Sequence, residues 1–377
     1  MTRLLFVLTL LANGQEGLRV DADFPGGNIV VDKIDGDAVS VHQDLRDTAG
    51  DWFYWQFRVR GAQGRTLTVT FTKGNVIGVL GPAVSRDAGA TWTWLGADAV
   101  KGASFKIAVD AAEVRFCVSI PYQEADLKKF LARHAEVTVE PHCTTAKGRT
   151  VERLRIGSGP TKLLFTARHH ACEMIASHVL EGLLEEALAD DWYRKNAEIA
   201  AIPFMDKDGV EDGDQGKNRK PRDHNRDYDG ESLYASTRAL RAFAPTWSGG
   251  KLKVAMDLHC PTLRGDHNET IYFVGSEDED NWKKVQRITG LLEAGQKGPL
   301  LYRTKDNVPF GTAWNTAANY TKGVHFSRWA QDLPGNPVAT TLEVSYANAN
   351  GTVVTADSAR ALGRDLARAL RKFLEGP

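Results

Sequence analysis

Residues 164–174, LFTARHHACEM, form an apolar run that ends in two adjacent histidines and a carboxylate. His170 and Glu173 stand three positions apart on an expected strand-to-helix turn, so an imidazole and a carboxylate can face one metal ion. His259 ends a second apolar run, LKVAMDLH, and can supply a third ligand. Two imidazoles and one carboxylate, with a fourth position open, are typical of a catalytic zinc site.

The neighbours of these residues have other expected roles. His169 competes with His170, but adjacent residues cannot easily face the same ion, so we expect His169 to lie behind the ligands or at the surface. Asp257 lies two positions before His259 on the same side of a strand and can orient a ligand. Cys172 and Cys260 are interpreted as small packing residues. With Cys117 and Cys143, they show no zinc-knuckle or disulfide spacing and leave the compartment undecided.

A polar loop and a buried carboxylate extend the set. The segment KNRKPRDHNRDY, residues 217–228, crowds an amide with guanidinium groups, which suit carboxylate binding: Asn225, Arg219, Arg222 and Arg226. A solvated loop held by its own aspartates is the alternative. Glu343 stands in the middle of the strand-like run ATTLEV, where we expect a carboxylate to be paired or catalytic.

The elements that must position these residues differ between the two parts of the chain. Up to about residue 120 the pattern is strand-like: Phe53, Trp55, Phe57 and Val59 share one face by period two, and glycine-rich turns recur. This predicts an antiparallel β-sandwich domain over residues 16–120. The tryptophans of this part could form a carbohydrate platform, although a place in the core or at its rim is the simpler interpretation: Trp52, Trp92 and Trp94.

After residue 120, short apolar runs alternate with helical patterns. Helices are expected at residues 123–134, after Glu173, at 281–295 and at 356–374, and strands at 149–156, 161–167, 198–204, 252–259, 269–275 and 338–346. This alternation predicts an α/β domain over residues 121–377, with a mixed, mostly parallel sheet and helices on both faces. Ligands bind such sheets at the carboxyl ends of the strands, so the polar clusters above should converge on one cleft.

The composition excludes some classes of partner. With 47 basic and 48 acidic residues the net charge is −1, so we expect no wholesale attraction to nucleic acid or to an anionic membrane. The apolar run from Leu4 to Ala12 follows Arg3 and is too short to span a bilayer, which takes ~20 residues. We interpret residues 1–15 as a secretory signal, which implies a secreted or periplasmic protein. A buried first strand in a cytoplasmic protein is the alternative.

Four motifs, taken in their order along the chain, resemble those of the zinc metallocarboxypeptidase family. The motifs are the His-x-x-Glu pair at 170–173, DHNR at 223–226, DLH at 257–259 and LEV at 342–344. The β-rich segment before them, with FPGGN and then DWFYWQFRV, is similar to the N-terminal domain of the cytosolic carboxypeptidase branch. The resemblance covers most of the chain, and the ordered combination is specific where each motif alone is weak.

The resemblance implies a peptidase that removes the C-terminal residue of peptides or proteins. It implies one zinc per chain on His170, Glu173 and His259, Glu343 as general base and acid, Asn225 and Arg226 on the terminal carboxylate, Arg219 on the scissile carbonyl, and Tyr320 closing over the substrate. Many secreted members carry an arginine between the first two ligands, where Ala171 and Cys172 stand here. Any contact to a residue upstream of the scissile bond is therefore in doubt.

Other functions stay open at this point. An amidohydrolase that releases an acyl group from an amino acid, or that trims peptidoglycan peptides, needs the same zinc, base and carboxylate clamp. A secreted binding protein with an inert zinc site is a third interpretation, although it would have no need of a buried Glu343. Basic residues near the expected pocket would favour an acidic terminal side chain unless they are merely solvated: Arg264, Arg303, Lys305 and Arg328.

Overall fold

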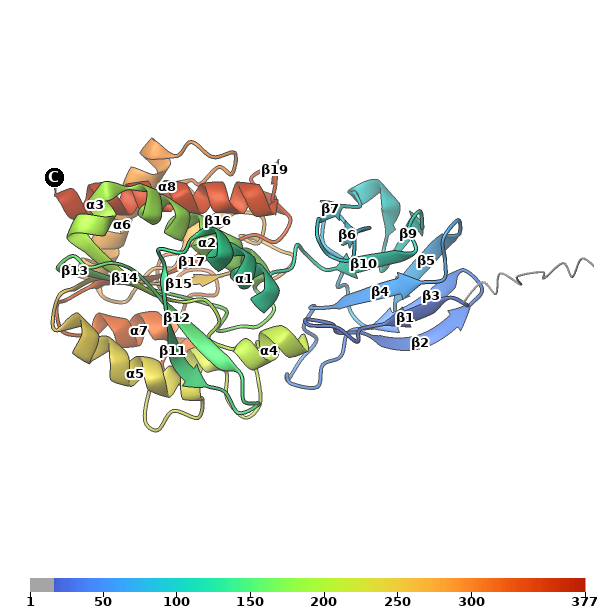
Figure 1. The fold of residues 1–377 in the computed structure, drawn as a ribbon, viewed down its shortest axis with the longest axis horizontal. Coiled ribbons are helices and arrows are strands. Elements are labelled where there is room, and N and C mark those ends of the chain that lie inside the picture. Colours follow the sequence, from blue (N-terminus) through green and yellow to red (C-terminus); the bar gives the residue numbers. More distant parts are fainter. Residues whose placement is uncertain (1–16, 377) are drawn as a thin grey trace, which may run out of the picture.

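The computed structural model describes residues 17–376, in which two β-sheets precede an α/β region (Figure 1). The predicted secretory signal at residues 1–15 lies outside this range. Within the described range, no helix combines the length and the apolar character needed to cross a membrane.

The N-terminal strands form two five-stranded sheets. The first sheet is antiparallel and has the order β1 (Arg19–Asp21), β4 (Gln56–Arg60), β10 (Glu113–Cys117), β6 (Ala83–Ser85) and β7 (Thr93–Trp94). The second sheet has the order β2 (Val30–Asp35), β3 (Ala38–His42), β5 (Thr66–Phe71), β9 (Ser104–Ala108) and β8 (Val100–Lys101). Its β3–β5 pair is parallel, which departs from the predicted antiparallel arrangement.

Aromatic side chains join these two sheets. The predicted period-two alternation buries Phe57 of β4 completely, and its ring centroid lies 5.1 Å from that of Phe116 in β10. Phe116 in turn lies 5.4 Å from Phe105 of β9, which belongs to the other sheet. The two sheets therefore share one core, as in a β-sandwich.

The second part of the chain is built on a mixed seven-stranded sheet. Its order is β11 (Thr138–Thr144), β12 (Thr150–Gly157), β14 (Ala197–Ile202), β13 (Thr161–Ala167), β15 (Leu252–His259), β17 (Val338–Val344) and β16 (Ile271–Phe273). The four central strands β14, β13, β15 and β17 are parallel, whereas β11, β12 and β16 join the edges in antiparallel pairs. The predicted mixed α/β fold is confirmed, with its parallel part confined to the centre.

Helices cover both faces of this sheet, which explains the continuous apolar runs in its strands. In β13, Leu163 and Phe165 pack into the core that also contains α2 (Met174–Ala189), α6 (Glu279–Gly295) and α8 (Ala356–Glu375). Leu164 points to the opposite face, into the core shared with α5 (Ala235–Ser248) and α7 (Phe326–Gln331). Figure 1 shows the two helical layers on either side of the strands.

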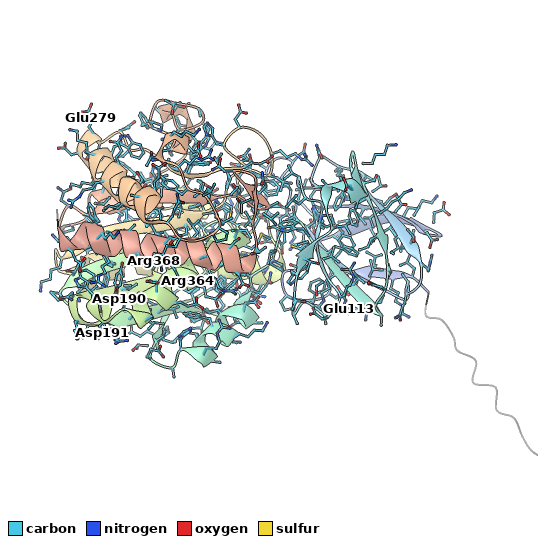
Figure 2. The ribbon with its side chains drawn as sticks, turned by 90° about the horizontal axis from the view of Figure 1, so that it is seen from above. Glu113, Asp190, Asp191, Glu279, Arg364 and Arg368 are labelled. Atoms are coloured by element: carbon cyan, nitrogen blue, oxygen red, sulfur yellow. The ribbon has the colours of Figure 1, made fainter. Side chains whose placement is uncertain are left out.

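The helices α2 and α8 pack closely because glycine lies at their crossing. A Cβ atom on Gly182 would lie 2.0 Å from the carbonyl oxygen of Arg360, and one on Gly363 would lie 2.0 Å from that of Val179. Arg364 of α8, labelled in Figure 2, pairs with Glu185 of α2 at 2.9 Å. The close contact buries the apolar face of α8 and fixes α2, which begins directly after Glu173.

Short elements connect these layers. They are α1 (Glu124–Arg133), α3 (Asp191–Asn196), α4 (Lys207–Asp212), the 3₁₀ turns η1 (Ala97–Ala99), η2 (His224–Arg226), η3 (Thr304–Asp306) and η4 (Ala317–Tyr320), and the hairpin of β18 (Asn348–Ala349) and β19 (Thr352–Val353). The loop between α4 and η2 carries much of the polar segment singled out above.

Candidate active site and metal centre

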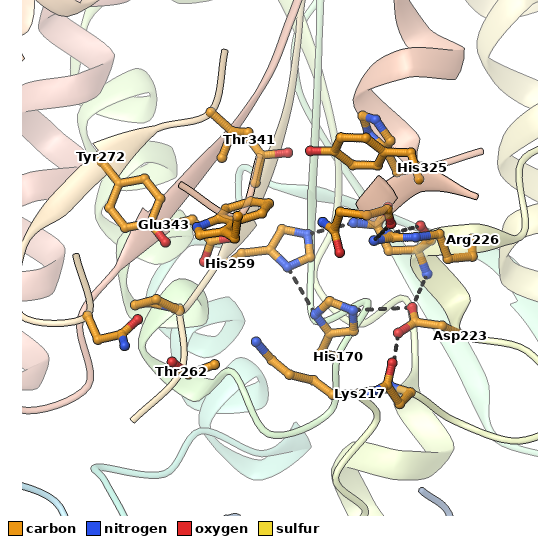
Figure 3. Close-up of a pocket in the computed structure, with 18 of the residues that line it drawn as sticks. His170, Lys217, Asp223, Arg226, His259, Thr262, Tyr272, His325, Thr341 and Glu343 are labelled. Atoms are coloured by element: carbon orange, nitrogen blue, oxygen red, sulfur yellow. Dashed lines mark hydrogen bonds and ion pairs between the residues drawn. The ribbon is translucent and has the colours of Figure 1, made fainter. Parts of the chain in front are cut away.

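The carboxyl ends of the central strands meet at one cavity of about 360 Å³. The turn after β13 carries His170, β15 ends at His259, and the Cα of Glu343 in β17 is the register partner of the Cα of His259. The loop after β14 contributes further polar side chains to the same cavity: Lys217, Asp223, Asn225 and Arg226. The predicted convergence of the four polar clusters is therefore present (Figure 3).

Three predicted metal ligands come together on one side of this cavity. One oxygen of Glu173 lies 2.9 Å from Nδ1 of His170, and the other lies 2.7 Å from Nδ1 of His259. The two Nδ1 atoms are 3.2 Å apart. All three side chains thus offer a ligand atom to one point, as a metal site requires.

The outer imidazole nitrogens face carboxylates. Nε2 of His170 lies 3.2 Å from Asp223, and Nε2 of His259 lies 2.5 Å from Asp257. Burial would raise the pKa of both aspartates, but the facing histidines outweigh it and hold each pKa below its usual range. A neutral imidazole that donates its Nε2–H to the facing aspartate directs its Nδ1 lone pair inward, which is the tautomer that binds a metal.

These observations decide whether a zinc ion fits the residues present. Two imidazole lone pairs and a carboxylate facing each other at these distances repel one another unless a cation or proton lies between them. The Glu173 oxygen that lies 2.7 Å from Nδ1 of His259 is buried and makes no hydrogen bond of suitable geometry in the described structure. The donor set is two imidazoles and a carboxylate, which suits zinc.

His169 is the competitor that the sequence left open, and the structure separates it from His170. Its Nδ1 lies 2.8 Å from Asp257 and its Nε2 lies 2.6 Å from the hydroxyl of Tyr228, so both nitrogens are occupied. It is fully buried and does not line the cavity. His169, Asp257 and His259 also form a group of potential ligands, but we interpret His169 as a support for Asp257.

Glu343 lies beside the metal cluster with its side chain facing the cavity (Figure 3). It is 8% exposed, and one of its oxygens is buried without a hydrogen-bond partner in the described structure. Burial raises its pKa to about 7. A carboxyl group with this pKa can both take up and release a proton near neutral pH.

Asn225 and Arg226 face the cavity from η2. The backbone N–H of Phe326 donates to the Asn225 amide oxygen at 2.9 Å, and the amide nitrogen lies 3.3 Å from Nε2 of His259. Arg226 donates to the carbonyl oxygens of Asn225 and Asn319, at 2.7 and 3.3 Å. Among residues 17–376, no carboxylate lies within 4.0 Å of Arg226, so its guanidinium is available for an anionic ligand.

Tyr320 lies next to this guanidinium. Arg226 sits 5.5 Å from the centre of its ring, and its hydroxyl donates to Asn315 at 2.6 Å. The ring lines the cavity, as a residue that covers a substrate must, while its hydroxyl points to Asn315.

Arg219 was predicted to act on the scissile carbonyl, and the structure places it elsewhere. It does not line the cavity and pairs instead with Asp206, with Asp214 at 2.9 Å and with Asp47 at 3.6 Å. These carboxylates outweigh burial and raise its pKa further above the ordinary value. The prediction is corrected: Arg219 is a partly buried counter-ion for three aspartates.

Lys217 is the cavity residue that the sequence did not reveal. It lines the cavity, is 9% exposed, and places its Nζ 2.7 Å from Glu173 and 3.2 Å from the carbonyl oxygen of Cys260. Burial alone would lower its pKa, but Glu173 and other anionic partners outweigh burial and raise it. Both Lys217 and Arg219 are cations in one loop, and no spacing rule tells which one faces the cavity.

The basic residues expected near the terminal side chain also lie elsewhere. None of them lines the cavity: Arg264, Arg303, Lys305 and Arg328. Arg264 donates to the carbonyl oxygen of Ile77, and Arg328 pairs with Asp332 at 3.4 Å. The structure therefore gives no support to the predicted preference for an acidic terminal residue.

The fold is that of the metallocarboxypeptidases. The structure of a metallo-carboxypeptidase from Burkholderia cenocepacia superimposes with a TM-score of 0.77 and 19% identity, covering 96% of this chain and 99% of that one. A metallo-carboxypeptidase from Pseudomonas aeruginosa gives a TM-score of 0.71 and 22% identity over 95% of this chain and 99% of that one. No protein-family model matches the chain.

Two curated proteins match part of the sequence. Cytosolic carboxypeptidase 6 of Caenorhabditis elegans is 25% identical over 238 residues, which is 52% of this chain and 51% of that protein. An uncharacterized protein of Zymomonas mobilis is 27% identical over 210 residues, which is 51% of this chain and 54% of that protein. The chain thus spans about half the length of the curated relatives it matches.

Proposed function

We propose that this protein is a zinc-dependent carboxypeptidase that hydrolyses the C-terminal residue from peptides or proteins. One observation carries the proposal: the candidate ligands His170, Glu173 and His259 meet beside a cavity that Glu343 and Arg226 line. Among residues 17–376, one Glu343 oxygen has no hydrogen-bond partner and no carboxylate pairs with Arg226. A metal site, a general base and an anion-binding group are the three elements that hydrolysis next to a free carboxylate requires.

The metal would be held by His170, Glu173 and His259, with Asp223 and Asp257 fixing the two imidazoles from outside. A zinc ion there would supply a Lewis acid and lower the pKa of a water from about 15.7 towards ~7. Glu343 accepts the proton as the oxygen of that water bonds to the carbonyl carbon. Glu343 then donates the proton to the amine that leaves as the carbon–nitrogen bond breaks.

Asn225 and Arg226 explain why cleavage would occur at the end of a chain. Arg226 uses two of its five N–H donors on backbone carbonyls and keeps the others for a carboxylate. Asn225 adds its amide NH₂ from the same turn. A terminal carboxylate held by this pair places the preceding peptide bond beside Glu343, and Tyr320 would cover the terminal residue.

The terminal residue itself should carry no charge. The cavity wall beyond Arg226 is formed by uncharged groups: Tyr272, Val274, Trp314, Tyr320, His325 and Thr341. Burial lowers the pKa of His325 to about 3, which keeps that imidazole neutral. Among the lining residues, the charged ones belong to the metal centre, its base or the loop 217–226, except the exposed Asp266.

The identity of the released product tests the proposal against an amidohydrolase. Peptides that differ only in a terminal alanine, leucine, phenylalanine, glutamate or lysine would be incubated with the protein, and products read by mass spectrometry. We expect free terminal amino acids, released faster from the uncharged peptides, and no release by His259→Ala. Release of an acyl group from N-acyl amino acids, with peptides left intact, would favour the amidohydrolase.

A further inference from the structure

The proposed reaction lacks a cationic side chain for the carbonyl oxygen once Arg219 is assigned to its three aspartates. As water adds to the carbonyl carbon, the π electrons move to the oxygen, which becomes an oxyanion. A fixed positive group near that atom binds the transition state more tightly than the ground state. Arg226 is assigned to the terminal carboxylate in the proposed function, so a side-chain cation that assists the metal has to be another residue.

Lys217 is the cationic side chain that lies beside the metal cluster (Figure 3). Its Nζ donates to Glu173 and to the carbonyl oxygen of Cys260, which follows His259 directly. A lysine ammonium has three donors, so one N–H remains for a ligand in the cavity. Trp52, which also lines the cavity, lies under the ammonium with its ring centre 5.3 Å away.

The backbone around Lys217 passes so close to the metal-ligand turn that a side chain would not fit beside it. Gly216 has φ +76°, and a Cβ there would lie 2.1 Å from the backbone nitrogen of Ala171. The N–H of Cys172 donates to the carbonyl oxygen of Gln215 at 3.2 Å. The loop is therefore docked on the turn between His170 and Glu173, and Lys217 has little room to move away.

The N-terminal sandwich holds the other side of this loop. The carboxylate of Asp47 accepts hydrogen bonds from the backbone N–H groups of Gln215 and Gly216, at 3.0 and 2.9 Å. The hydroxyl of Thr48 donates to the carbonyl oxygen of Lys217 at 2.5 Å. These contacts join two segments 168 or more residues apart in sequence, so the position of Lys217 depends on the N-terminal part of the chain.

We propose that Lys217 is the catalytic cation that stabilises the oxyanion, and that Asp47 and Thr48 of the N-terminal sandwich are its positioning residues. This inference rests on the proposed carboxypeptidase function. It gives the N-terminal sandwich a part in the reaction, since the sandwich both fixes Lys217 and contributes Trp52 to the cavity wall. Lys217 forms no covalent bond in the step, and the proton of the attacking water still goes to Glu343.

Charge-removing and charge-retaining variants of Lys217 test the assignment. Lys217→Met keeps the length of the side chain without its charge, and Lys217→Arg keeps the charge. Lys220→Met is the matched control, because Lys220 is exposed in the same loop. Each variant would be assayed for bound zinc, for kcat and KM on a free-acid peptide, and for the Kd of a phosphonate analogue whose anionic oxygen replaces the scissile carbonyl oxygen.

We expect Lys217→Met to keep its zinc and lose about 100-fold or more in kcat, since removal of one oxyanion donor has that effect. Its affinity for the phosphonate should fall in parallel, Lys217→Arg should recover part of both, and Lys220→Met should match the wild type. Normal kcat in Lys217→Met, or a loss of rate that only follows a loss of zinc, would overturn the assignment.

Thr48→Val tests the positioning role with a small change that keeps the shape of the side chain. We expect a lower kcat in the wild-type background and no further loss when Lys217→Met is already present, because the two changes act through one group. Independent, additive losses would overturn the positioning claim. If the wild type releases no amino acid from any peptide, both the proposed function and this inference are wrong. If the wild type is active but Lys217→Met leaves kcat unchanged, only the role of Lys217 is refuted.

Discussion

The proposed carboxylate clamp of Asn225 and Arg226 leads to a quantitative prediction about the end of the substrate. A peptide that ends in a carboxamide offers no charge to Arg226 and leaves that guanidinium unpaired in a partly closed cavity. A hydrogen bond to a charged group contributes about 1.5 to 3 kcal/mol, so the amide should be cut about 10- to 150-fold more slowly than the free acid.

Arg226→Ala should remove most of this difference by slowing only the free acid. Truncation deletes the donors that the structure leaves free for a carboxylate, together with the contacts to the backbone carbonyls of Asn225 and Asn319. The ratio of kcat/KM for acid over amide should therefore approach one in the variant.

The assay compares initial rates on two peptides of identical sequence, one with a free terminus and one amidated. Arg328→Ala is a suitable control, because Arg328 is a half-exposed arginine that does not line the cavity. Equal rates on both peptides in the wild type would refute the clamp. They would direct attention to an enzyme that recognises its substrate from the acyl side.

Three further predictions follow from the cavity and its surroundings. Glu343→Gln keeps the shape of the base without its basicity, so zinc content should stay normal while kcat falls at least ~100-fold, and a normal kcat would make Glu343 merely structural. Arg219→Gln removes the cationic partner of the buried Asp206, whereas Asp214 keeps Arg46, and it should lower the free energy of unfolding by ~3–5 kcal/mol in a urea titration. Unchanged stability with a catalytic defect as large as that of Glu343→Gln would instead support a catalytic role for Arg219. Burial lowers the pKa of His142, in strand β11, from 6.5 to about 4, so between these pH values the unfolded chain binds more protons than the folded one. The free energy of unfolding should therefore fall as the pH drops from 6.5 towards 4, by up to about 1.4 kcal/mol per pH unit. His142→Gln should show a shallower slope in the same pH series, and an identical slope would exclude His142 as a contributor.

The central strands and the metal cluster could be predicted because their sequence signals are local. Strand β13 (Thr161–Ala167) and strand β15 (Leu252–His259) have the predicted bounds, since a parallel strand covered on both faces must be apolar along its whole length. Polar side chains that follow such strands have to meet at the same edge of the sheet. One histidine of the pair after β13, together with His259 and Glu343, was therefore predictable from its place at a strand end.

Other features depend on contacts between distant segments, which the sequence does not show. Lys217 and Arg219 are cations two positions apart that lie on different sides of one loop. Residues of the N-terminal part contact both: Thr48 donates to the carbonyl oxygen of Lys217, and Asp47 pairs with Arg219. The antiparallel edge strand β16 and the parallel β3–β5 pair also depend on register rather than on composition. The choice between His169 and His170 required the positions of Asp257 and Tyr228.

The zinc requirement of hydrolysis tests the central claim most directly. Metal-stripped protein would be titrated with zinc while the release of the terminal amino acid from a free-acid peptide is measured. The proposed site predicts no release without zinc and a rise that saturates at about one zinc per chain, with no such rise for His170→Ala combined with His259→Ala. Release that is independent of zinc, or a double variant that responds to zinc as the wild type does, would contradict the proposed metal centre.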